Sequence, residues 1–98
     1  MVILSDKTVR DGLRAACAIR EGKLPTTDEI AAAPRLSGWA IVDAETGFPR
    51  LVGVVHNHPR LANGWCTTSV VLAMDPDGHW ARTMSRLYHL SEPLGLTL

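Results

Sequence analysis

The chain has 98 residues, of which 46% are hydrophobic and 20% are charged. This composition is typical of a globular protein and excludes a disordered one. The length suits one domain, residues 1–98, and excludes large enzyme folds such as the TIM barrel. The ten basic and ten acidic side chains balance, which argues against a strongly basic nucleic-acid binder. No apolar run approaches the roughly 20 residues that span a bilayer, so we expect no membrane partner.

The helical part of the chain, residues 5–33, begins with an amphipathic segment. Ser5 is a typical N-cap, and apolar residues recur from there at helical spacing. Gly22 suits the position just after a helix end. The pattern predicts a helix over about 6–21, with Leu13 in the core.

A short second helix is expected directly before Pro34. Thr26 and Glu29 have the spacing of a capping box, in which each side chain bonds the backbone N–H of the other residue. Pro34 ends the helix because it cannot continue the hydrogen-bond ladder.

The remainder of the chain, residues 36–91, has the pattern of a β-sheet. Turn signals separate stretches rich in β-branched and apolar residues. The expected strands cover residues 39–42, 51–55, 65–74 and 79–90. Because no helix lies between them, we expect an antiparallel meander. The predicted fold class is therefore α+β, with two N-terminal helices packed on a four-stranded antiparallel meander sheet.

The two cysteines, Cys17 and Cys66, are too few for a disulfide-stabilised secreted domain. We expect two reduced thiols in a cytoplasmic protein, although a single bridge between them is not excluded by the sequence. A nucleophilic pair of Cys66 and His56 is an alternative, but a thiol packed in the core is expected.

Two histidines form the sharpest candidate for metal chemistry. The string Val54–Pro59 places His56 and His58 two residues apart, and it resembles the His-x-His-Pro element of the JAB/MPN metalloproteases, which bind zinc. That family has a Ser and an Asp farther along, where this chain has Cys66 and Ser69. Because serine does not replace the third ligand and zinc sites need three or four ligands, we expect no metal and no cofactor. His56 and His58 are weak candidates, and a metal-dependent hydrolase is an alternative function.

The main candidate binding site lies on the last expected strand. Alternation along residues 79–90 places five side chains on one face, namely Trp80, Arg82, Met84, Arg86 and Tyr88. Tryptophan, tyrosine and arginine are enriched at binding hot spots, and the same set could stack and hold single-stranded nucleic acid. The predicted binding residues are Trp80, Arg82, Arg86 and Tyr88, together with Arg60. The alternative is that the aromatic rings cover the core edge while the arginines extend over it.

The chain also resembles a group of small bacterial single-domain proteins of unknown function. Six segments carry this resemblance: Arg35–Trp39, Pro49–Gly53, His58–Pro59, Thr67–Ser69, Trp80–Thr83 and Ser85–Leu90. The group offers no catalytic residues to transfer and implies one compact bacterial domain.

The sequence favours a non-enzymatic interaction module that binds a protein partner through a sheet face or the 56–64 loop. A phage- or plasmid-borne regulator or inhibitor of a host complex fits this description. A weak single-stranded nucleic-acid binder is the other alternative, and the oligomeric state stays open.

Overall fold

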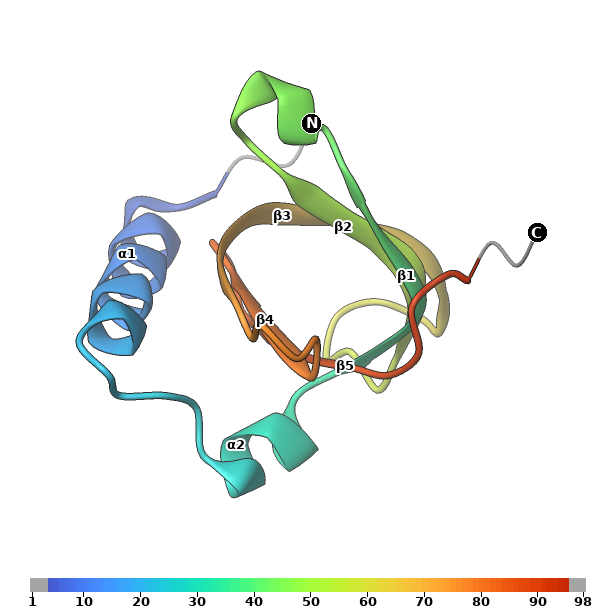
Figure 1. Ribbon diagram of the computed structural model, residues 1–98, viewed down its shortest axis with the longest axis horizontal. Helices are drawn as coiled ribbons and strands as arrows, with labels where there is room; N and C mark the ends of the chain where they lie inside the picture. The colour runs from blue at the N-terminus through green and yellow to red at the C-terminus, as the bar shows by residue number, and fades with distance from the viewer. Residues whose placement is uncertain (1–3, 96–98) are drawn as a thin grey trace.

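The computed structural model describes residues 4–95. Two helices precede five strands in the chain (Figure 1). The elements are α1 (Asp6–Arg20), α2 (Thr27–Ala32), β1 (Arg35–Val42), the short 3-10 helix η1 (Ala44–Thr46), β2 (Arg50–His56), β3 (Gly64–Met74), β4 (Trp80–Thr83) and β5 (Leu87–Leu90). The expected α+β class with two N-terminal helices is confirmed, whereas the four-stranded sheet is not.

Both ends of α1 form as the sequence predicts. The Ser5 side chain accepts a hydrogen bond from a backbone N–H of the first turn. At the other end, Gly22 has a φ of +96°, which glycine adopts without strain. The N–H of Gly22 bonds the Ile19 carbonyl, and the N–H of Lys23 bonds the Ala18 carbonyl, each at 2.9 Å. These two bonds make a Schellman motif, which satisfies carbonyls that the helix end would leave free.

The capping box of α2 is also confirmed. The N–H of Thr26 donates to Glu29 Oε1 at 3.0 Å, and the N–H of Glu29 donates to Thr26 Oγ1 at 3.1 Å. The helix ends at Ala32, immediately before the strand region.

The five strands close into a barrel in the order β1-β2-β3-β4-β5. Consecutive strands pair antiparallel, and β1 closes on β5 in parallel, with Arg35 beside His89 and Leu36 beside Leu90. The closing pair is parallel because five strands of alternating direction leave the first and the last pointing the same way. Closure therefore covers part of the edge that each terminal strand would otherwise expose.

The expected fourth strand, residues 79–90, is wrong: it is a hairpin of β4 and β5. The turn at Met84 and Ser85 is held mainly by hydroxyl groups. Thr83 Oγ1 donates to the Arg86 carbonyl at 3.1 Å, and Ser69 Oγ accepts from the Ser85 N–H at 3.1 Å. Sequence patterning missed this turn because it contains neither glycine nor proline, and its hydroxyl partner on β3 lies 16 residues away.

The barrel interior is the hydrophobic core. Its buried side chains are Leu36, Leu51, Val55, Ala81, Tyr88 and Leu90. Thr68 is buried among them, and its hydroxyl accepts from the Leu51 N–H at 3.0 Å and donates to the Ser69 carbonyl at 2.8 Å. A buried hydroxyl with both partners carries little desolvation cost.

Small residues of α1, rather than leucine, make its buried contact with the barrel. Gly12 and Ala16 are buried, whereas Leu13 is 50% exposed, so the predicted core position of Leu13 is wrong. A side-chain carbon at Gly12 would overlap the carbonyl oxygen of Met84 and lie 3.1 Å from its carbonyl carbon. The helix backbone therefore lies directly on the β4–β5 turn, and this close approach points Leu13 toward solvent.

The two helices cover one side of the barrel. α1 packs mainly against β3 and β4, and α2 packs mainly against β5. In Figure 1, β1 and β2 lie on the opposite side of the barrel from both helices. Within the described residues 4–95, neither helix packs extensively on β1 or β2.

Candidate interaction surface

The five side chains expected on one strand face are divided by the hairpin. Ala81 lies opposite Tyr88, and Arg82 lies opposite Leu87. Because directly opposed side chains share a face, Tyr88 points into the barrel with Ala81, whereas Trp80 and Arg82 lie on the outer face. Trp80 and Tyr88 are only 6% and 3% exposed. The expectation that the five side chains share one strand face is therefore wrong, because the turn at residues 84–85 folds the two halves of the segment onto each other.

The three arginines of the predicted site remain accessible in part. Arg60 is exposed in the loop between β2 and β3, and Arg82 and Arg86 are half-buried. Arg82 lines a pocket under α1, and burial lowers the pKa of its guanidinium, a shift that nearby Asp11 opposes. Arg82 thus lies under α1, whereas Arg60 and Arg86 both lie near His58, and the two aromatic rings are buried rather than exposed beside them.

The two candidate metal-binding histidines have different environments. His56 Nε2 lies 3.3 Å from the hydroxyl of Ser37 on the outer wall of the barrel. His58 Nδ1 accepts from the N–H groups of Arg60 and Leu61 at 3.0 and 3.2 Å. The His58 ring centroid is 6.2 Å from that of Tyr88. Burial, with Arg86 and Arg60 nearby, lowers the pKa of His58, which favours the neutral ring.

A group that could hold a metal ion occurs elsewhere, at the turn between β3 and β4. Among residues 4–95, the side chains of Asp75, Asp77 and His79 lie close enough together to share one ion. The Asp75 carboxylate already accepts from the N–H groups of Asp77 and His79, so it stabilises the turn. Neither His56 nor His58 belongs to this group.

The pairing of Cys66 with His56 that the sequence left open does not form. Cys66 lies opposite Gly53, on the inner side of β3, whereas His56 lies on the outer side. Cys66 and Cys17 are both unbridged. Burial raises the pKa of the Cys66 thiol, and burial raises that of Tyr88 to about 12. Neither group is activated as a nucleophile at neutral pH.

A largely apolar strip runs along the outer side of β2, which we call the β2 outer face (Ala40, Val52, Val54, Trp65 and Thr67), with the polar Ser37 opposite Val54 at its edge. The strand register creates it: Val54 lies opposite Trp65, and Val52 lies opposite both Ala40 and Thr67. Trp65 is 64% exposed. A large aromatic ring on a rigid strand, beside two valines that the helices do not cover, is the arrangement most suited to contact with another molecule.

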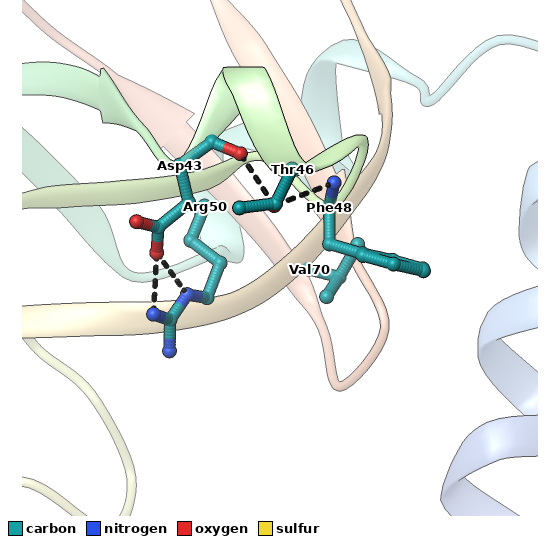
Figure 2. A pocket seen from close by; sticks show the side chains of 5 residues that line it. All are labelled: Asp43, Thr46, Phe48, Arg50 and Val70. Atoms are coloured by element: carbon teal, nitrogen blue, oxygen red, sulfur yellow. Dashed lines mark hydrogen bonds and ion pairs between the residues drawn. The ribbon is translucent and has the colours of Figure 1, made fainter.

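A shallow hollow of about 360 Å³ continues the β2 outer face beyond Arg50. Asp43, Thr46, Phe48, Arg50 and Val70 line it (Figure 2). Arg50 Nε donates to Asp43 Oδ2 at 3.0 Å, and Arg50 Nη2 makes a second contact with the same oxygen. Figure 2 shows this ion pair on one side and the Phe48 ring extending away from it on the other. Phe48 is 65% exposed. The hollow therefore has an accessible aromatic ring beside an arginine whose charge is paired with Asp43.

Sequence reasoning missed Trp65 and the β2 outer face, although one signal was present. Residues 51–55 are apolar without interruption. The buried members are Leu51, Gly53 and Val55, and the outward members are Val52 and Val54. An antiparallel strand with one solvated face normally alternates with polar residues. The apolar residues at every position of this strand thus leave Val52 and Val54 on its outer side.

No helix in the described residues has the length and apolar character needed to cross a membrane. Residues 4–96 match the model of a family described as "Family of unknown function (DUF6634)". The chain therefore belongs to this family, which confirms the expected likeness to small proteins of unknown function; no JAB/MPN family is found. No curated protein and no solved structure matches the chain.

Proposed function

We propose that this member of a family of unknown function is a non-enzymatic module that binds a protein partner through the β2 outer face. The observation that carries the proposal is the exposed Trp65 ring on an apolar strip that neither helix covers. The apolar residues on both faces of β2 support it, because only one of those faces is used by the barrel core.

The exposed Trp65 ring can supply a substantial part of the energy of binding. A tryptophan buries about 150–250 Å² when it is fully enclosed. Covering the part of Trp65 that is still exposed would therefore contribute about 3 kcal/mol at about 25 cal/mol per Å². The flanking valines and the Phe48 ring add contact area along the same side of the sheet.

The charges around the face favour a protein over a nucleic acid. The five residues that define the face are uncharged, and Arg50 at its end is paired with Asp43. Nucleic-acid binding depends on cations that are free to contact phosphates. Arg35 and Arg60, both exposed, lie toward the other end, so the partner we expect has an apolar patch with an acidic rim.

The proposed role is that of a regulator or inhibitor that occupies a surface of a larger complex, without a chemical step of its own. The raised pKa values of Cys66 and Tyr88 support a non-catalytic role, because both groups stay protonated. We place this role in the cytoplasm. The unbridged state of Cys17 and Cys66 supports that setting.

Site-specific photo-cross-linking tests the proposal. A photoreactive phenylalanine analogue replaces Val52 on the proposed face, and the control carries it in place of Leu13, which is exposed on α1. We expect a defined protein adduct from position 52 and none from position 13. The Trp65→Ser substitution should remove the adduct while circular dichroism stays unchanged.

Three outcomes would contradict the proposal. One is equal cross-linking from positions 52 and 13, and another is an adduct that persists in Trp65→Ser. The third is an adduct that consists of nucleic acid, which would favour the nucleic-acid alternative.

A further inference from the structure

A second feature lies on the opposite side of the barrel, where Arg82 faces the helices. The Nε atom of Arg82 is buried and has no hydrogen-bond partner. No carboxylate among residues 4–95 lies within 4 Å of its guanidinium as an ion pair. A buried donor without an acceptor is costly. Because Nε is closed to solvent, a ligand in the pocket would contact the terminal nitrogens of the guanidinium, a group well shaped to bind carboxylates.

Arg82 borders a pocket of about 240 Å³ between the helical segment and the β4–β5 hairpin. The pocket walls are mainly apolar and come from α1, from the segment before α2 and from β5. They consist of Ala15, Ala18, Ile19, Leu24, Pro25 and Leu87. The volume is below the roughly 300–1,000 Å³ of sites for drug-sized ligands, so the site suits a molecule of about ten non-hydrogen atoms.

The charges near this pocket favour an anion. Lys23 also lines it, and Arg86 acts on Arg82 from nearby. Two carboxylates oppose them. Glu29 lines the pocket and keeps its negative charge while it accepts from the Thr26 N–H, so it offsets one of the three cations, whereas Asp11 is paired with Lys7 at 2.9 Å. A positive potential therefore remains at Arg82.

We propose that this pocket binds a small monocarboxylate with a short apolar tail, with the Arg82 guanidinium holding the carboxylate and the α1 and β5 side chains enclosing the tail. The inference is independent of the β2 outer face, which lies on the other side of the barrel. A free phosphate fits less well, because it would place charged oxygens against the alanine, isoleucine and leucine walls.

Titration with sodium hexanoate, followed by amide chemical shifts in ¹H–¹⁵N NMR spectra, tests the proposal. We expect saturable shifts in residues 15–19, 23–25 and 82–87, with a Kd of about 1 mM. Hexanamide, which has the same tail without the charge, should bind at least about tenfold more weakly. Inorganic phosphate, which has charge without the tail, should also bind at least about tenfold more weakly.

Two substitutions separate the charge from the cavity. Arg82→Met keeps the length of the side chain and removes the guanidinium, and it should weaken hexanoate binding at least about tenfold. Ala18→Leu fills the pocket without changing any charge, and it should weaken binding by a similar factor. The control, Arg60→Met, removes an exposed arginine that does not line the pocket and should bind hexanoate as the unmodified chain does.

The proposal is overturned if hexanoate gives no saturable shift up to about 50 mM, or if phosphate binds as tightly as hexanoate. It is also overturned if Arg82→Met keeps full affinity. If Arg82→Met does not fold, two other measurements test the site. The site is rejected if hexanamide binds as tightly as hexanoate, or if Ala18→Leu binds hexanoate as tightly as the unmodified chain does.

Discussion

Replacing Gly12 by alanine tests how closely α1 lies on the β4–β5 turn. In an isolated helix the substitution is favourable, because alanine exceeds glycine in helix propensity by about 1 kcal/mol. In this fold the added methyl group would overlap the Met84 carbonyl oxygen, and it would lie 3.1 Å from both the Met84 carbonyl carbon and its sulfur. The two effects have opposite signs, so the measured sign reveals which one dominates.

The steric effect should dominate. Its largest contact is with a backbone carbonyl, which cannot rotate away as a flexible side chain can. Forcing an extra carbon into a packed contact typically costs about 1–3 kcal/mol, and a shift of α1 would also disturb the buried contact at Ala16. Because the overlap is with backbone, we take the upper part of this range, about 2–3 kcal/mol. After the propensity gain of about 1 kcal/mol is subtracted, we expect a net loss of about 1–2 kcal/mol in the free energy of unfolding. For a domain of this size, that lowers Tm by about 5–15 °C.

Urea denaturation followed by circular dichroism measures this loss. Arg14→Ala, at an exposed position two residues along the same helix, is the matched control and should change stability by less than about 0.5 kcal/mol. If Gly12→Ala is neutral or more stable than the unmodified chain, α1 does not make the close approach described above.

Three further outcomes are expected. Leu13→Ala should lower the free energy of unfolding by less than about 1 kcal/mol because the side chain is half exposed. Leu36→Ala in the barrel core should lower it by about 2–5 kcal/mol. Equal losses in denaturant melts would refute the assigned burial. The pKa of His58 is lowered below its ordinary 6.5 in the folded state. The unfolded chain therefore binds the proton more readily, and the free energy of unfolding should fall as pH decreases below 6.5. His58→Asn should reduce this pH dependence of stability, and an unchanged dependence would show that another group causes it. Elemental analysis of purified protein should find no stoichiometric zinc, because His56 and His58 have different environments and no shared third ligand; one zinc per chain, lost on changing both histidines to alanine, would contradict this.

Local features were predicted well because short-range chemistry determines them. The Ser5 cap, the Schellman end at Gly22 and the capping box of Thr26 with Glu29 each depend on residues within a few positions of one another. A hydrogen bond between such neighbours is satisfied in the same way in almost any fold that contains the helix. The sequence also indicated the helix-then-strand order for the same reason.

The candidate site was predicted less well because strand register decides it. Alternation along residues 79–90 is correct within β4 and within β5, but the turn at Met84 and Ser85 places Tyr88 opposite Ala81 and inside the barrel. A change of register or direction alters which side chains share a face. The exposed ring that sequence analysis sought on β4 and β5 is instead Trp65 on β3.

The sequence by itself determined the helix boundaries, the α+β class and an apolar strand over residues 51–55. Only the tertiary structure decided that the sheet closes into a barrel, that Leu13 is exposed while Gly12 is buried, and that Arg82 borders a pocket without an acceptor for its Nε atom. The physical reason is that propensity and capping depend on neighbours along the chain. Closure, close helix contact and the partners of a buried cation depend on groups that the fold brings together from distant positions.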